Sequence, residues 1–199
     1  MRKKRLPNPP SKAVLLYKAF YICYTVAMKY NYKALYEKNA AFLEKRPMFK
    51  RCLKYVTPLL SAFFFGAYVF LWIYGIFVKD LATMDYVKLF TLAATAYLLV
   101  VVLRSAVARP RPYSEKGANI KPLLKRKGSE TDSFPSRHVT CAAVISMLVL
   151  SHFTAVGVLM LGLTAFLSYA RFATGMHYPS DIFGGLALGI AVGVFAWIW

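Results

Sequence analysis

Three short clusters in the second half of the sequence hold side chains that can bind an anion, attack it or move a proton. In chain order the clusters are RSAVARPRP, SFPSRHVT and YARFATGMHYPSD, and their candidate site residues are Arg104, Arg111, Ser136, Arg137, His138, Arg171, His177 and Asp181. Arginines bind phosphate oxygens through charge-assisted hydrogen bonds, and an imidazole acts as nucleophile, acid or base near neutral pH. Several cations with two histidines and one carboxylate therefore indicate binding and attack of phosphate, and not metal binding by carboxylates.

The first cluster lies where an apolar segment ends. Arg104 and Arg111 are seven residues apart, close to two helical turns, so they share a face if the helix continues. Pro110 and Pro112 predict instead that the helix ends before them, which leaves Arg109 and Arg111 in a stiff, extended exit. The alternative is that these arginines only anchor a helix end or mark the cytoplasmic side.

The second cluster reads as the start of a helix. Pro135 fixes the entry, Ser136 is a favourable N-cap, and Arg137 and His138 then lie in the first turn. The exposed N–H groups and the dipole at such an end attract an anion. The alternative is an ordinary capped helix whose His138 packs at the membrane interface.

The third cluster pairs a histidine with a carboxylate. Arg171 ends an apolar segment, His177 follows a loop that contains glycine, and Asp181 falls in the first turn of a helix that begins at Pro179 and Ser180. A carboxylate near one imidazole nitrogen sets the tautomer and makes the other nitrogen a better nucleophile or base. The alternative is a purely structural hydrogen-bonded pair.

The elements that must position these clusters are membrane helices. Hydrophobic residues make up 58% of the 199 residues and the mean hydropathy is +0.46, although the net charge is +18. About 20 apolar residues span a bilayer, and we expect spans at 13–28, 55–78, 86–103, 139–170 and 182–199. The fourth segment is too long for one crossing and is predicted to fold back near 151–157. We therefore expect an all-α, polytopic membrane bundle of about six transmembrane helices, with 1–199 as a single domain.

This topology brings the three clusters to one membrane face, because the folded segment is a hairpin that returns the chain to the side of the second cluster. The basic segment 29–54 is either an amphipathic segment on anionic headgroups or a solvated loop. Cys23, Cys52 and Cys141 are too few and too far apart to indicate a disulfide framework or a zinc site.

Three motifs in this order resemble the type 2 phosphatidic acid phosphatase (PAP2) superfamily: Arg104-x6-Arg111-Pro112, Pro135-Ser136-Arg137-His138 and Arg171-x5-His177-x3-Asp181. The superfamily includes integral-membrane lipid phosphate and pyrophosphate phosphatases. Its pattern usually has Lys at the position of Arg104, Gly at that of Arg137 and Ser at that of Ala170. Arg104 keeps the cation, and Ala170 lacks a hydroxyl that contacts phosphate. Arg137 adds a cation that touches the lipid headgroup or a second phosphate, or points to solvent.

The resemblance implies a mechanism. His177, oriented by Asp181, attacks phosphorus and forms a phosphohistidine, and His138 protonates the leaving group before it helps water release phosphate. The phosphate oxygens are held by Arg104, Arg111, Ser136, Arg171 and the backbone near Arg137. The resemblance implies no metal and no cofactor.

The implied partners are a lipid phosphate substrate and membrane lipids, with no nucleic acid. Phosphatidate, phosphatidylglycerophosphate and undecaprenyl diphosphate all remain open as substrates, as does the oligomeric state. The resemblance places the active site outside the cytoplasm, although the basic segments 29–54 and 104–137 run against the positive-inside tendency.

Two other functions stay open: a non-catalytic lipid-phosphate binding or transport protein, and a vanadate-dependent haloperoxidase.

Overall fold

The regular secondary structure is helical throughout the described part of the chain. The structure is a computed structural model that describes residues 32–78, 82–114, 120–123 and 132–198. Residues 32–44 are helical, and five longer helices follow: α2 (Pro47–Val78), α3 (Thr83–Val107), α4 (Arg137–His152), α5 (Thr154–Ala173) and α6 (Pro179–Ile198). The expected span at 13–28 lies outside the described residues.

The helices predicted from residue 55 onward are confirmed. Within the described ranges, α2, α3, α5 and α6 are long and apolar enough to cross a membrane, and α4 is a shorter apolar helix of 16 residues. The long apolar segment at 139–170 is two helices, because α4 ends at His152 and α5 begins at Thr154.

The described part of the basic segment 29–54 is helical in two pieces. Residues 32–44 form a helix of their own, and α2 begins at Pro47, so residues 47–54 belong to the first turns of α2. Proline is favoured at the first position of a helix because its missing N–H has no partner there in any case. Pro47 therefore starts a new helix within the basic segment.

Helix α4 lies at the centre of the bundle and packs against α2, α3, α5 and α6. Ten of its residues are buried, from Val139 to Val149, so it is apolar on nearly all sides. Glycines of α6 allow the closest approach: a Cβ at Gly189 would lie 2.6 Å from the Thr140 carbonyl oxygen. Small residues spaced four apart let membrane helices pack backbone to backbone. The start of α6 is thereby pressed against the start of α4.

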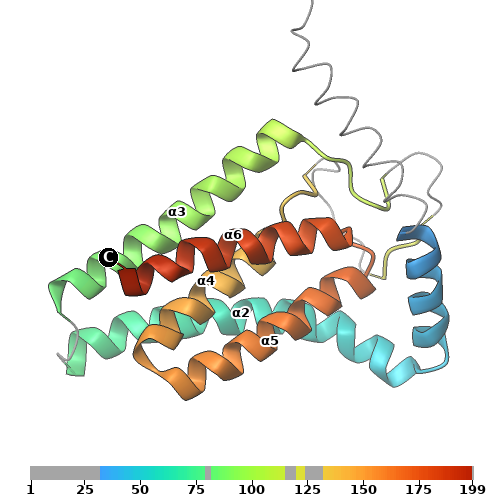
Figure 1. Cartoon of the computed structure of the whole chain (residues 1–199). Helices are drawn as coiled ribbons and strands as arrows, with labels where there is room; N and C mark the ends of the chain where they lie inside the picture. Colours follow the sequence, from blue (N-terminus) through green and yellow to red (C-terminus); the bar gives the residue numbers. More distant parts are fainter. Residues whose placement is uncertain (1–31, 79–81, 115–119, 124–131, 199) are drawn as a thin grey trace, which may run out of the picture.

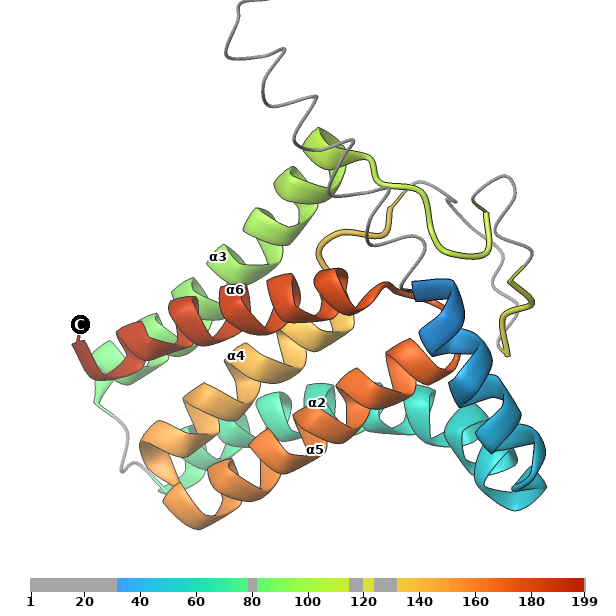
Figure 2. The same ribbon diagram turned by 45° about the vertical axis from the view of Figure 1, so that its right-hand side comes forward.

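All three clusters lie at one end of the bundle. Helices α3 and α5 end there, and α2, α4 and α6 begin there (Figure 1). The helix at residues 32–44 stands across this same end in both views (Figure 2). Helix α3 ends at Val107, before Pro110 as predicted, and Ala108 adopts a left-handed conformation with φ 44° that turns the chain toward the other clusters.

Candidate active site

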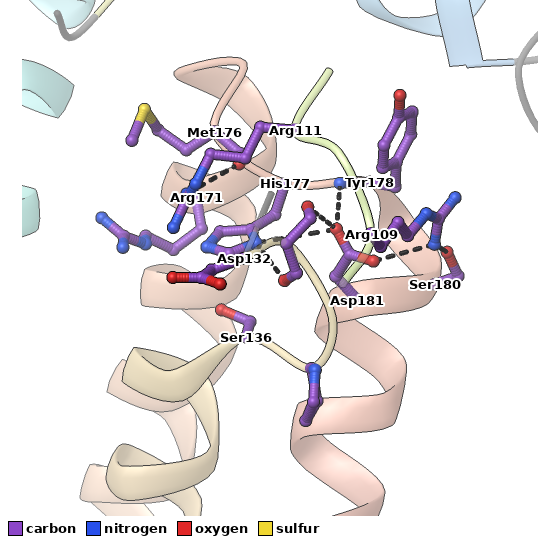
Figure 3. A network of polar contacts seen from close by, with 12 residues as sticks. Arg109, Arg111, Asp132, Ser136, Arg171, Met176, His177, Tyr178, Ser180 and Asp181 are labelled. Atoms are coloured by element: carbon purple, nitrogen blue, oxygen red, sulfur yellow. Dashed lines mark hydrogen bonds and ion pairs between the residues drawn. The ribbon is translucent and has the colours of Figure 1, made fainter. Parts of the chain in front are cut away.

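Asp181 is the fixed anion of the site. Its side chain is fully buried in the first turn of α6. The carboxylate accepts hydrogen bonds from the Arg109 guanidinium at 2.8 Å, the Ser133 hydroxyl at 2.5 Å and the Tyr178 N–H at 2.9 Å (Figure 3). A buried charge is stable when it is both paired and hydrogen-bonded. Asp181 satisfies both conditions.

Arg109 is enclosed on several sides. Its guanidinium also donates to the Ser180 hydroxyl at 2.7 Å and lies 4.1 Å from the centre of the Tyr178 ring. The Tyr178 ring packs edge-on against Tyr32, with the ring centres 4.8 Å apart. The helix at residues 32–44 is therefore linked to the ion pair through two aromatic rings.

His177 is held in one tautomer. Its Nδ1 atom lies 3.0 Å from the Ser133 carbonyl oxygen and 3.6 Å from Asp181 Oδ2. A carbonyl oxygen only accepts hydrogen bonds, so Nδ1 carries the proton and Nε2 keeps its lone pair. The predicted orienting carboxylate is thus near the ring, but the closer acceptor is a backbone carbonyl, which the sequence motif did not indicate.

The environment of His177 keeps the ring neutral. The side chain is 1% exposed, in the turn between α5 and α6. Burial lowers the pKa of His177 from its usual 6.5 to about 4; the Asp181 carboxylate opposes this shift, and the charge of Arg171 supports it. A neutral imidazole with a free Nε2 lone pair is the form that can attack phosphorus.

Three of the predicted arginines, Arg104, Arg111 and Arg171, are buried, and they have different neighbours. Arg111 donates to the Met176 carbonyl at 3.3 Å, and Arg171 contacts His138 Nδ1 at 2.7 Å. Figure 3 shows the His177 ring between Arg171 and Asp181, with Arg111 beside it. Arg104 donates to the carbonyls of Asp132 and Pro135. Arg104 therefore holds the loop before α4 in place through two backbone carbonyls.

Ser136 begins α4 as predicted, but its hydroxyl does not cap the helix. The residue precedes Arg137 in an extended conformation, and its side chain makes no capping hydrogen bond. The Oγ atom is buried, and among the described residues it has no hydrogen-bond partner. A buried hydroxyl without a partner is costly, so this one is available to a bound ligand.

His138 lies where the polar site meets an apolar groove. The groove has a volume of about 410 Å³ and runs between α2, α3 and α4, with Arg137 and His138 in its lining. Because an arginine only donates, Arg171 makes His138 Nδ1 an acceptor, and the proton of a neutral ring lies on Nε2. Phe65 and Tyr97 line the same groove and are exposed, so it opens toward the lipid side.

The structure brings most of the predicted residues together and adds two. Arg111, Ser136, His138, Arg171, His177 and Asp181 gather at one end of the bundle, whereas Arg104 faces the loop and Arg137 the groove. Sequence reasoning missed Arg109 as the partner of Asp181 and Ser133 as the partner of His177. The only signal for Arg109 was its position beside Arg111. Across the described ranges, no three His, Cys, Asp or Glu side chains gather as a metal-binding group.

A family model described as the PAP2 superfamily matches residues 85–199, more than half of the chain. The chain belongs to the PAP2 superfamily. The match includes all three clusters of this PAP2 protein, so the resemblance carried by its motifs is confirmed.

Known relatives agree with this membership. Lipid A 1-phosphatase of Rhizobium etli is 30% identical over 102 residues, which is 51% of this PAP2 chain and 44% of that relative. The PAP2 chain thus spans less than half the length of the curated relative that it matches.

Two crystal structures share the fold. A transmembrane PAP2 type phosphatidylglycerolphosphate phosphatase from Bacillus subtilis has a TM-score of 0.67 at 24% identity, covering 93% of this chain and 94% of that one. LpxE of Aquifex aeolicus has a TM-score of 0.53 at 23% identity, covering 76% and 93%. The predicted all-helical membrane fold of this PAP2 protein is therefore confirmed.

Proposed function

We propose that this protein is an integral-membrane lipid phosphatase that passes a phosphoryl group from a lipid to His177 and then to water. The observation that carries the proposal is a neutral, oriented His177 beside Arg111 and Arg171, at the end of the bundle where a groove opens to lipid. The names of the relatives support it, since one is a lipid A 1-phosphatase and another a phosphatidylglycerolphosphate phosphatase.

In the first step, His177 Nε2 forms a bond to phosphorus and the bond from phosphorus to the lipid oxygen breaks. Arg111, Arg171 and the Ser136 hydroxyl hold the phosphate oxygens and offset the charge that spreads over them. Asp181 and the Ser133 carbonyl keep the Nδ1–H in place while the ring becomes a cation.

His138 supplies the proton that the lipid oxygen needs. When phosphate attracts Arg171, Nδ1 of His138 is released and can take up a second proton. The ring then gives its Nε2 proton to the leaving oxygen. In the second step it takes a proton from the water that attacks the phosphohistidine, which releases phosphate and restores His177.

The groove between α2, α3 and α4 suits the lipid tail. Its lining between Ser61 and Tyr68 of α2 is mostly aromatic and apolar, and its polar end holds His138. A lipid can therefore keep its chain at membrane depth while its phosphate reaches the end of the bundle. We further propose that this end faces outside the cytoplasm, which cysteine labelling at an engineered position between residues 116 and 127 tests.

Ser136→Ala tests the phosphate-binding part of the site. We expect kcat/KM for phosphate release to fall about tenfold, because a hydrogen bond to a charged group contributes roughly 1.5–3 kcal/mol. The thermal midpoint in detergent should stay near that of the unmodified protein, since the described residues offer this hydroxyl no partner. Unchanged kcat/KM would remove Ser136 from the site.

The decisive experiment is phosphate release by the purified full chain from phosphatidate, phosphatidylglycerophosphate and a polyprenyl diphosphate, with and without EDTA. We expect release from at least one lipid, and the same rate when EDTA is present. Tight binding without release would identify a binding or transport protein instead, and loss of activity in EDTA would contradict the metal-independent mechanism.

A further inference from the structure

The polar end of the lipid-side groove carries a cation that the mechanism above does not use. Arg137 lines the groove beside His138, and the groove lining includes no Asp or Glu. Arg137 is half-buried, and no hydrogen bond or ion pair joins it to another residue of the described ranges. A cation that is partly removed from water is stabilised by an anion. The groove therefore favours a ligand with negative charge at this point.

The position of Arg137 relative to the reaction follows from the two histidines. In phosphoryl transfer the attacking atom and the leaving oxygen lie roughly in line on opposite sides of phosphorus. His177 attacks from the buried side, and His138 protonates the leaving oxygen at the mouth of the groove. The leaving group thus lies in the groove, beside Arg137.

The phosphate that His177 attacks has its own cations, on the side of the site away from the groove. Arg111 and Arg171 are buried next to His177 and do not line the groove. Arg137 is 26 residues from Arg111 and 34 from Arg171 in the chain, and it reaches the ligand from the first turn of α4. Arg137 lies on the lipid side of the leaving oxygen. If the ligand carried a single phosphate, held near His177, no anion would lie beside Arg137.

From this arrangement we infer that Arg137 binds a second phosphate that remains on the leaving group, so that the preferred substrate class is a lipid diphosphate. The inference rests on the proposed phosphatase function. His177 bonds to the terminal phosphorus, the bond from that phosphorus to the bridging oxygen breaks, and His138 protonates the bridging oxygen. The products are a lipid monophosphate and, after water attacks the phosphohistidine, inorganic phosphate. With a lipid monophosphate the leaving group is an uncharged alcohol, and Arg137 contributes little.

The test compares two substrates with the same chain, farnesyl diphosphate and farnesyl monophosphate, on the purified full chain in detergent. We expect the unmodified protein to have the higher kcat/KM with the diphosphate. Arg137→Gln should lower the ratio of the two kcat/KM values about tenfold, as expected for loss of a hydrogen-bonded charge pair. Arg137→Lys keeps the positive charge but lacks the planar guanidinium that can donate two parallel hydrogen bonds, so it should give an intermediate ratio. Arg51→Gln, an exposed arginine of α2, should leave the ratio unchanged.

The outcomes separate the inference from the proposed function. An equal loss on both substrates in Arg137→Gln, or a preference of the unmodified protein for the monophosphate, would overturn the role of Arg137 while phosphatase activity stands. Release of phosphate from neither compound would contradict the proposed function and this inference with it.

Discussion

Replacing His177 with alanine is expected to lower phosphate release at least about 10³-fold, because the variant lacks the atom that attacks phosphorus. In the structure this ring is buried, its Nδ1–H points to the Ser133 carbonyl, and Nε2 keeps its lone pair. No other histidine is held in this way in the described chain, since His138 contacts Arg171 through Nδ1. The measurement is initial-rate phosphate release from the best lipid of the substrate screen.

A matched control is available in the third histidine. His152 ends α4, at the end of the bundle opposite to the site. His152→Ala should keep activity within about threefold of the unmodified protein, because it removes an imidazole without touching the phosphate site. Acid-labile phosphate should also be trapped on the unmodified protein and be missing from His177→Ala. Full activity in His177→Ala would falsify the phosphohistidine mechanism.

Arg109→Ala is expected to have the largest effect on stability. The variant leaves the Asp181 carboxylate buried without its ion-pair partner, and breaking a buried pair from one side costs about 3–5 kcal/mol. Activity should fall as well, because Asp181 faces Nδ1 of His177 at 3.6 Å. Thermal midpoints in detergent and kcat measure the two effects.

A double-mutant cycle separates the ion pair from general damage to the fold. Asp181→Ala alone leaves the Arg109 cation buried, whereas the double variant removes both charges. The double variant should therefore lose less stability than the sum of the two single losses. Strictly additive losses would show that Arg109 and Asp181 act independently. Arg109→Lys keeps the charge and should recover part of the stability.

Local chemistry explains why the helix ends near the site were predictable. Proline lacks an N–H and has a fixed φ, so Pro110 predicts the end of α3, and Pro179 predicts the start of α6. The hairpin of α4 and α5 followed from bilayer thickness, because 139–170 is too long for one crossing. These properties depend on a few neighbouring residues or on the membrane alone.

The choice among neighbouring arginines was not predictable in the same way. Arg109 and Arg111 are two residues apart in an exit without regular structure, and both carry the same charge. Ala108 turns the backbone through a left-handed conformation, after which Arg109 meets Asp181 and Arg111 meets Met176. Which guanidinium pairs with the carboxylate depends on the path of α6, more than 70 residues later in the chain.

The sequence alone determined the class of molecule and which residues make up the site. Membrane helices and the three motifs can be recognised from residue types and from short spacings along the chain. The tertiary structure decided what each member touches. Arg104 binds the loop before α4, the Ser133 carbonyl sets the tautomer of His177, and Arg137 faces the lipid groove. These contacts join segments far apart in the chain through the close packing of α4 on α6. Spacing along a sequence carries no information about the directions that such packing imposes on side chains.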